Sequence, residues 1–412
     1  MRILHTADWH LNDKLGRIDR TNDLQIRVEK VAGLCEEHQA DVLLIAGDLF
    51  HDRASREEVT DSLKHLRGTF KSFFARNGTI LAVTGNHDKD HSIELVRAGM
   101  GLAAPAGVPI GGTILPGRMY LFNAAWFGKL QAPGDDFMTQ FVMLPYPFPS
   151  RYLEEDERRR CRTPEEEHSA VEGKVAGWFK NLPENREQYD ETARTVLVAH
   201  MSVSGADLSR GLFRLSIKDD VLLDGGNLPV WPDYVALGHI HKPQCLRGLA
   251  HVRYSGSLDR LDFGEREDDR GVVLVEIGSD GRRGEPQVLG LEPTPMYHVT
   301  VTDDTVTEAE LRSQYPDADR ALVRITVQYR SGADSRDSIE RVIRATFPRF
   351  TMIEWREAGK ESDPGGQVVS PKADFRTQVR QYLESKLEKD EQKVALLALA
   401  ECYLSAKVEG PV

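Results

Sequence analysis

The feature that most constrains this sequence is a series of short apolar runs that each end in polar residues. The runs are four to eight residues of almost continuous apolar character, as in strands buried on both faces of a sheet: "RILHTA" from Arg2, "DVLLIAGD" from Asp41, "TILAVTGNHD" from Thr79, "TVLVAH" from Thr195 and "DYVALGHIH" from Asp233. Apolar residues at helical spacing lie between the first three runs, one set from Leu24 to Leu34 and another from Val59 to Phe74. Strands alternating with helices predict an α/β layered sandwich.

The character of the chain changes after the last of these runs. We expect residues 1–290 to form the main domain and residues 291–358, with strands and a helix of their own, to form a small β/α domain. The Gly/Pro/Ser-rich residues 359–373 read as a linker, and residues 374–412 as helices with an apolar face. That tail could dock on its own domains or bind another protein chain. The charged residues 151–191 predict a solvated helical insertion, with a partner surface as the alternative.

Composition excludes several classes of protein. The four cysteines are far apart and form no C-x-x-C pair, so neither a disulfide framework nor a thiolate zinc site is indicated. No stretch approaches the roughly 20 apolar residues of a membrane span, which predicts a cytoplasmic protein. The net charge of -12 argues against a surface that attracts nucleic acid everywhere, although a local basic groove can coexist with an acidic total.

Metal-binding residue types follow five separate strands. The strand ends carry Asp8 and His10 in "ADWH", Asp48 and His51 in "GDLFH", Asn86, His87 and Asp88 in "GNHD", then His200, and finally His239 and His241 in "GHIH". Each motif alone is more often a turn or a core residue than a ligand. Their joint appearance at strand ends, where α/β proteins build their sites, predicts one shared centre.

The donor types indicate which ions such a centre would bind. Imidazole and carboxylate without thiolate suit Mn²⁺, Fe²⁺ or Zn²⁺, with Mg²⁺ also possible. There are enough ligands for two divalent ions. Two cations roughly 3.5–4 Å apart can activate water and neutralise charge on a phosphoryl group, and a carboxylate is the natural bridge between them. A histidine held off the metals could stabilise the transition state or protonate the leaving oxygen.

The motif series resembles the calcineurin-like metallophosphoesterases, which are four-layer α/β/β/α sandwiches. Within them, "ILHTADWHLNDKLGR", "LLIAGDLFHDRASR", "VALGHIHKPQ" and "YSGSLDRLDFGEREDDRGVVLVEI" resemble the SbcD family, the nuclease subunits of bacterial SbcC/SbcD complexes. The resemblance covers about residues 1–290. It is looser over residues 291–358, which correspond to a capping domain, and concerns only the architecture of the tail.

The resemblance implies a role for each motif residue. It assigns Asp8, His10 and His241 to one ion, Asn86, His200 and His239 to the other, and Asp48 to the bridge between them. It makes His87 the catalytic histidine, His51 a supporting histidine and Asp88 the group that orients His87. The family commonly has glycine at the position of Asn12 and often Ser-Pro where this chain has Lys89-Asp90. Near the motifs, Arg17, Arg20, Arg53 and Lys89 could contact DNA phosphates or could simply be solvated.

The resemblance also implies activity and partners. It implies Mn²⁺-dependent exonuclease activity on duplex ends and endonuclease activity on single strands and hairpins, in double-strand-break repair and recombination. The partner would be an SbcC-type ABC ATPase, whose coiled coils the helices of residues 374–412 would bind. A homodimer through residues 56–74, within a nucleoid-associated heterotetramer, is also implied. Two alternatives stay open, namely a phosphoesterase acting on a small phosphodiester or phosphoprotein, and a non-catalytic scaffold for a partner ATPase.

Overall fold

The structure of the protein is a computed structural model. It describes residues 1–88, 90–103, 112–184, 189–207, 220–302, 304–331 and 335–357. The expected linker and helical tail at residues 359–412 lie outside the described residues, as does Lys89. The chain divides into two compact units. The first comprises Met1–Tyr297, Asp317–Val323 and Phe347–Thr351, and the second comprises His298–Pro316, Arg324–Thr346 and Met352–Val412.

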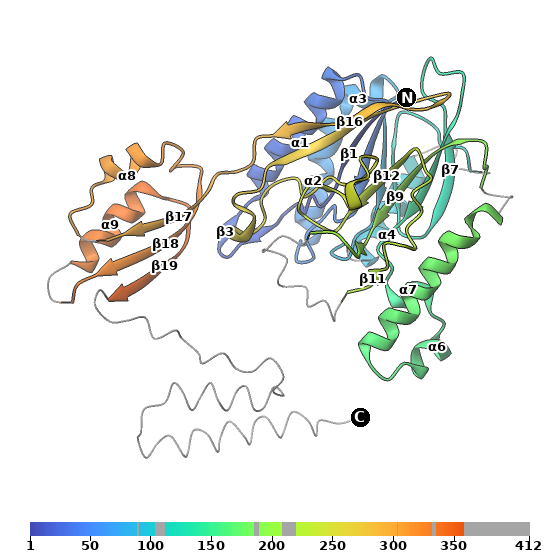
Figure 1. Cartoon of the computed structure of the whole chain (residues 1–412). Coiled ribbons are helices and arrows are strands. Elements are labelled where there is room, and N and C mark those ends of the chain that lie inside the picture. The colour runs from blue at the N-terminus through green and yellow to red at the C-terminus, as the bar shows by residue number, and fades with distance from the viewer. Residues whose placement is uncertain are drawn as a thin grey trace. The chain divides into compact units, whose positions relative to one another are not determined.

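A six-stranded sheet in the order β16-β15-β1-β4-β5-β6 holds the N-terminal motifs (Figure 1). Its strands are β1 (Arg2–Thr6), β4 (Val42–Ala46), β5 (Thr79–Val83), β6 (Met119–Phe122), β15 (Arg270–Gly278) and β16 (Gly281–Leu291). Strands β1, β4, β5 and β6 are parallel, whereas β15 and β16 are antiparallel additions at one edge. The expected apolar runs are therefore real strands, and their carboxyl ends share one edge of the sheet.

A second six-stranded sheet holds the remaining motifs, in the order β13-β14-β12-β9-β8-β7. Its strands are β7 (Trp126–Leu130), β8 (Thr139–Leu144), β9 (Arg194–His200), β12 (Tyr234–Gly238), β13 (Gln244–Cys245) and β14 (Val252–Tyr254). Strands β8, β9, β12 and β14 are parallel, so the ends that carry His200 and His239 also share an edge. Two short pairs, β2 (Lys14–Leu15) with β3 (Ile18–Asp19) and β10 (Ser202–Val203) with β11 (Leu222–Leu223), lie in the loops beyond the strand ends.

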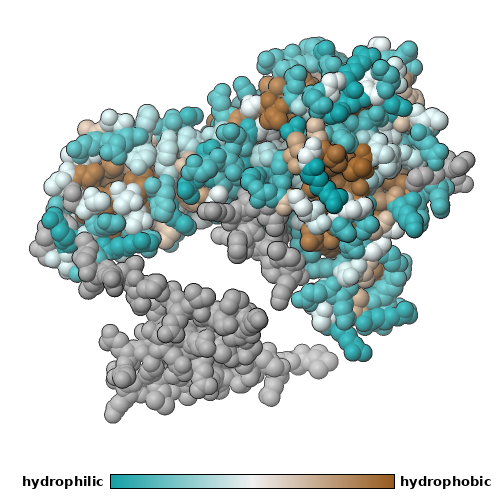
Figure 2. Space-filling model, viewed as in Figure 1, coloured by the Kyte–Doolittle hydropathy of each residue, from teal (hydrophilic) through white to brown (hydrophobic). Residues whose placement is uncertain are grey.

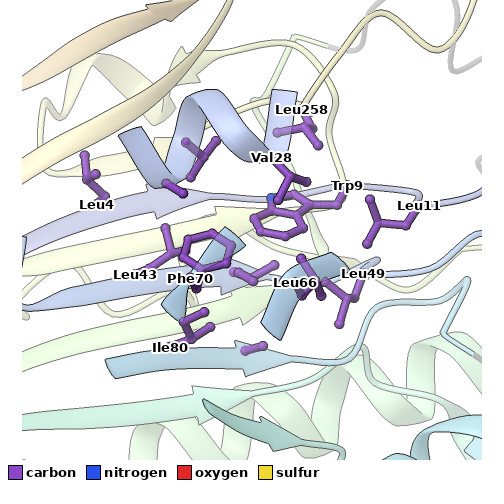
Figure 3. Packing of buried hydrophobic residues seen from close by; sticks show 14 of the residues in the cluster. Leu4, Trp9, Leu11, Val28, Leu43, Leu49, Leu66, Phe70, Ile80 and Leu258 are labelled. Atoms are coloured by element: carbon purple, nitrogen blue, oxygen red, sulfur yellow. The ribbon is translucent and has the colours of Figure 1, made fainter. Parts of the chain in front are cut away.

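Three buried clusters show how the layers stack. Residues of both sheets, among them Ile3, Leu44 and Val198, form the cluster between them. A second cluster lies between the first sheet and its helices (Figure 3): α1 (Thr21–Glu37), α2 (Arg56–Thr69), α3 (Lys71–Ala75) and α4 (Asp90–Ala103). The third lies on the outer face of the second sheet. Helix, sheet, sheet and helix are thus successive layers, which confirms the expected four-layer α/β/β/α class.

The helix expected from Val59 to Phe74 is interrupted. Helix α2 begins with a capping box, in which Ser55 accepts from the backbone N–H of Glu58 and the Glu58 carboxylate accepts from the backbone N–H of Ser55. It ends at Thr69, one residue after Gly68, and α3 starts at Lys71. Glycine has poor helix propensity, and Phe70 turns inward at the break to stack on Trp9 with ring centroids 6.4 Å apart.

The charged segment expected to be a solvated insertion is helical, with one apolar side. It contains α5 (Pro149–Tyr152), α6 (Glu155–Arg160) and α7 (Pro164–Asn181). Helix α7 buries Val171, Val175 and Phe179 against the second sheet, while its visible outer surface is mostly hydrophilic (Figure 2). This segment therefore supplies the outer helical layer of the second sheet.

The small sheet expected in the C-terminal part has three strands in the order β17-β18-β19: β17 (Met296–Val301), β18 (Leu322–Tyr329) and β19 (Phe350–Glu357). Two helices connect these strands, α8 (Glu308–Gln314) and α9 (Arg336–Thr346). Helix α9 buries Ile339 and Ile343, in accordance with its amphipathic sequence. Among the described residues, no helix is long and apolar enough to span a bilayer.

Candidate metal centre

The motif residues meet where the parallel strands of the two sheets end. Each of three motifs contains a glycine that leaves room for a neighbouring strand. A Cβ atom at Gly47 would lie 1.9 Å from Nδ1 of His200, one at Gly85 would lie 2.1 Å from Oδ1 of Asp48, and one at Gly238 would lie 1.8 Å from the carbonyl oxygen of Ala46. The strand ends are thus packed at distances that only glycine permits.

One group of possible ligands comes from the first and fifth motifs. Ligand atoms of Asp8, His10 and His241 all lie within 4.8 Å of one another. Asp8 and His10 both have a left-handed backbone, with φ of 51° and 44°. Such strained residues gather at functional sites, where the surrounding fold holds them in place. The backbone N–H of His239 donates to both carboxylate oxygens of Asp8, at 3.0 and 3.1 Å, which fixes this side chain.

A second group combines the third, fourth and fifth motifs. Oδ1 of Asn86 lies 3.1 Å from Nε2 of His200 and 3.0 Å from Nδ1 of His239. Asp48 stands between the two groups, because its Oδ2 is 3.5 Å from Nε2 of His10 and 3.4 Å from Nε2 of His200. One carboxylate oxygen therefore faces a histidine from each group, as a bridging ligand would.

Each of three histidines is oriented by a partner on its other nitrogen. Nδ1 of His200 is 2.7 Å from the carbonyl oxygen of Ala46, so this nitrogen donates and Nε2 faces the centre. Nε2 of His239 is 2.8 Å from Oδ2 of Asp220, and Nδ1 of His241 is 2.9 Å from Oε1 of Glu265. Such partners fix the tautomer of a metal-binding imidazole and raise its basicity.

The ionisable groups of the centre shift one another's pKa values. Burial opposes protonation of His200, but the adjacent Asp48 carboxylate raises its pKa to about 9. Burial would likewise raise the pKa of Asp48, yet His200 and the neighbouring histidines hold that pKa well below its usual value. Burial lowers the pKa of His10 far below the ordinary value. His200 and Asp48 thus favour each other's charged forms.

The donor set fits a divalent metal ion. Nε2 of His10 is buried and has no hydrogen-bond partner, although it faces Asp48. An orphaned buried nitrogen is costly unless something binds it, and a cation between these groups would satisfy it. Imidazole, carboxylate and amide oxygen donors suit borderline and hard divalent ions. The residues present therefore fit two metal ions that share Asp48.

The candidate catalytic residues line a cavity of about 440 Å³ beside the ligands. His87 is half-buried there, its backbone N–H donates to Oδ1 of Asp48 at 2.8 Å, and its ring centroid is 4.8 Å from that of His10. The His51 ring lies 6.2 Å from the His87 ring. Both imidazoles are thus available to a group that enters the cavity.

Asp88 contacts the backbone of two loops and has a different role from the expected one. Its carboxylate accepts backbone hydrogen bonds from Leu49 at 3.1 Å, Phe50 at 2.9 Å and Gly85 at 2.9 Å. Burial and the nearby Asp48 charge raise its pKa to about 6. The expectation that Asp88 orients the His87 ring is therefore corrected, since Asp88 holds together the two loops that carry Asp48 and Asn86.

The expected DNA-contacting cations divide into two kinds. Arg17 and Arg53 are exposed, and Arg53 lines the cavity. Arg20 is fully buried, with its guanidinium 3.0 Å from Asp259 and 3.4 Å from Asp23. A buried and paired guanidinium neither reaches a DNA phosphate nor is solvated, so both interpretations of Arg20 are wrong. Lys89 lies outside the described residues.

The sequence motifs do not include three side chains that contact histidines of the site. Glu265 and Asp220 orient metal-centre histidines, and Asp13 contacts His51. Acidic residues are usually exposed, so no sequence pattern separated these from the many other carboxylates of the chain. Glu265 does lie inside a segment that carries the family resemblance, which is the one signal that could have drawn attention to it.

Known proteins match the chain in sequence and structure. The model of the family described as calcineurin-like phosphoesterase matches residues 1–243. A relative from Rhodobacter capsulatus, named as the D subunit of the nuclease SbcCD, is 27% identical over 311 residues, which are 73% of this chain and 71% of the relative.

Two solved structures are also similar to the chain. A dimetal phosphatase from Danio rerio matches with a TM-score of 0.40 at 12% identity, covering 70% of this chain and 98% of that one. The protein TT1561 of Thermus thermophilus matches with a TM-score of 0.35 at 13% identity, with the same shares covered. Since the family model spans more than half of the sequence and includes every expected ligand, the chain belongs to the calcineurin-like phosphoesterase family.

Proposed function

We propose that this chain is the nuclease subunit of an SbcC/SbcD-type complex and hydrolyses phosphodiester bonds in DNA. The observation that carries the proposal is the position of Asp48, whose Oδ2 lies within 3.5 Å of a histidine from each of two ligand groups. That arrangement suits a pair of metal ions acting on one phosphate. The similarity to the Rhodobacter capsulatus SbcCD nuclease subunit supports DNA as the substrate.

The residues of the chain have separable tasks in this reaction. Two divalent ions, Mn²⁺ foremost, held by the two groups and by Asp48, would supply activation of water and neutralisation of charge on the phosphate. His87 lies in the cavity beside Asp48, where its imidazole can hydrogen-bond to the phosphate or give a proton to the leaving oxygen. His51 lines the same cavity and would supply a second hydrogen-bonding group to the phosphate.

The wider assignment follows the relative and the sequence pattern. We propose exonuclease activity on duplex ends and endonuclease activity on single strands and hairpins, in double-strand-break repair. The partner would be an SbcC-type ABC ATPase, bound through residues 374–412. The assembly would contain a homodimer of this chain and act in the cytoplasm at the nucleoid. Exposed Arg17 and Arg53 are the proposed phosphate contacts along the DNA path.

The decisive experiment replaces His87 by Gln and measures cleavage of linear duplex DNA with Mn²⁺. Gln removes the titrating imidazole with little change in size, so we expect loss of activity by about 100-fold or more with both metals still bound. The matched control is His38→Gln, which changes a histidine at the end of α1, outside the cavity. Full nuclease activity of the His87→Gln variant would refute the assigned mechanism.

A second candidate, hydrolysis of a small phosphodiester, is favoured by the charges around the cavity. Asp13, Asp52, Asp262 and Glu265 line it, whereas its described cations are Lys14 and Arg53. Lys14 is paired with Glu58 at 3.0 Å, so it offers little attraction to a polyanion. Parallel assays with linear DNA and bis-p-nitrophenyl phosphate separate the two. Hydrolysis of the small ester alone would favour this candidate.

A further inference from the structure

His51 is held from both sides inside the cavity. Its Nδ1 accepts a hydrogen bond of 3.0 Å from the backbone N–H of Arg53. A ring nitrogen that accepts carries no proton, so in the neutral imidazole the proton is on Nε2. That nitrogen lies 3.3 Å from Oδ1 of Asp13. Nε2 of His51 is therefore close to a carboxylate that belongs to none of the five motifs.

Asp13 is itself fixed by the fold. Its side chain is only 11% exposed. Its backbone N–H donates to the carbonyl oxygen of His10 at 2.9 Å, and its carbonyl oxygen accepts from the backbone N–H of Arg20 at 3.2 Å. The guanidinium of Arg20 lies 3.8 Å from Oδ2 of Asp13, on the side away from His51. The Asp13 carboxylate thus has one oxygen toward a buried cation and the other toward the histidine.

Arg20 is anchored independently of Asp13. Its guanidinium is 3.0 Å from Oδ2 of Asp259, and it also donates to the carbonyl oxygen of Arg260. Asp259 in turn accepts from the backbone N–H of Thr294 at 2.8 Å. A fully buried arginine with several fixed partners is rigid, so the cation that faces Asp13 stays in one place.

We propose that Asp13, which faces the buried guanidinium of Arg20, is a positioning residue that fixes the tautomer and the direction of His51 in the cavity. This inference rests on the proposed function only for its effect on rate. A histidine that must meet a phosphate oxygen needs one defined ring orientation, and a carboxylate on its second nitrogen provides it, as carboxylates do for metal-binding histidines.

Other charged groups face the same ring. Oδ1 of Asp52 lies 3.0 Å from Nδ1 of His51, but Asp52 is 46% exposed and so is well screened by water. The rings of His10 and His87 lie 6.4 and 6.2 Å from that of His51. Asp52 would favour a proton on Nδ1, whereas the Arg53 N–H and Asp13 together favour Nε2. The tautomer of His51 therefore reports which carboxylate controls it.

The first test reads this tautomer directly. Histidine-labelled full-length protein is loaded with diamagnetic Mg²⁺, and two-bond ¹H–¹⁵N correlation spectra are compared, with His51 assigned by its loss in His51→Gln. We expect the Nε2–H form in the unchanged protein and a mixture of tautomers in Asp13→Ala. Asp52→Asn is the matched control and should keep the Nε2–H form. An unchanged His51 signal in Asp13→Ala would overturn the proposal.

The second test is a double-mutant cycle on hydrolysis of bis-p-nitrophenyl phosphate with Mn²⁺. Asp13→Ala should lower kcat by about 10- to 100-fold with KM and metal content unchanged. In a His51→Ala background the same substitution should lower kcat by less than about twofold, because Asp13 acts through His51. An equal loss in both backgrounds would show a merely structural role and refute the inference.

A conservative variant guards against misfolding. Asp13→Asn keeps an oxygen beside Nε2 of His51 and should retain most of kcat, while a thermal melt checks the fold of each variant. If the unchanged protein hydrolysed neither DNA nor the small ester, the proposed function would fail. The spectra would still decide whether Asp13 positions His51, so the two failures are distinguishable.

Discussion

Replacing Glu265 by Gln tests whether the partners of the ligands matter as much as the ligands. Glu265 is 1% exposed; Oε1 lies 2.9 Å from Nδ1 of His241, and Oε2 lies 2.6 Å from Nη2 of Arg270. Burial alone would raise the pKa of Glu265, but His241 and Arg270 hold it at about 2. Gln keeps an oxygen for His241 and removes the charge that balances Arg270.

The magnitude follows from these contacts. Breaking a buried ion pair costs about 3–5 kcal/mol, and Asp268 still lies 3.7 Å from Nη1 of Arg270, so we expect a loss near 3 kcal/mol in the free energy of unfolding. Loss of a group that orients a ligand weakens metal affinity by about 10- to 100-fold. Because Gln keeps an oxygen beside His241, we expect the lower end of this range, a tenfold loss of affinity or about 1.4 kcal/mol.

Two assays measure the two effects. Urea unfolding of the metal-free protein gives the stability, and titration calorimetry with Mn²⁺ gives the affinity. The matched control is Glu267→Gln, an 80% exposed position two residues away, which should change stability by less than about 0.5 kcal/mol. Unchanged Mn²⁺ affinity in Glu265→Gln would refute the view that this carboxylate tunes His241 and would leave it a purely structural role.

Three further predictions concern the loops that carry the ligands. Gly47→Ala should abolish high-affinity metal binding, seen by elemental analysis, because its Cβ would lie 1.9 Å from His200 and its φ is +96°; retention of both ions would contradict the packing. Asp48 raises the pKa of His200 to about 9, so this ring should be protonated at pH 7.5 and should release its proton when metal binds. Calorimetry in buffers of different ionisation enthalpy should show that His200→Asn releases about one proton fewer on metal binding than the unchanged protein. Equal proton release by the two proteins would contradict the pKa shift. Asn12→Gly should lower the free energy of unfolding, measured in urea, by about 1 kcal/mol, because Asn12 accepts a buried hydrogen bond of 2.9 Å from Ser62. A gain in stability would mean that relief of backbone strain at the Asn12 φ of +72° outweighs the lost hydrogen bond.

The sequence predicts those parts of the fold that have local signals. Buried parallel strands appear as continuous apolar runs, and the polar residues that follow them were predicted to meet. The structure places ligand atoms of Asp8, His10 and Asp48 close together. Strand β16 had no such signal. Its sequence, with Gly281, Gly284, Gly290 and a proline, has low strand propensity, and pairing with β15 gives it its conformation.

The remaining parts of the site depend on contacts far apart in the sequence. His241 and Glu265 are 24 residues apart, and His239 and Asp220 are 19 apart, so no spacing rule connects them. Arg20 shows the converse error. A basic residue near an acidic site was interpreted as either a DNA contact or a solvated side chain, but carboxylates distant in sequence surround it in the fold. Which charges pair can be decided only when the tertiary structure is known.

The glycine-lined contact between the strand ends has a consequence for assembly. Asp8, His10 and Asp48 follow strands of one sheet, whereas His200 and His239 follow strands of the other, and Asp48 faces histidines from both. The centre therefore does not exist on either half of the sandwich alone and forms only when the two halves have joined. Ions bound there would hold the two sheets together at their strand ends. We therefore expect removal of the ions to weaken the contact between the sheets before either sheet unfolds.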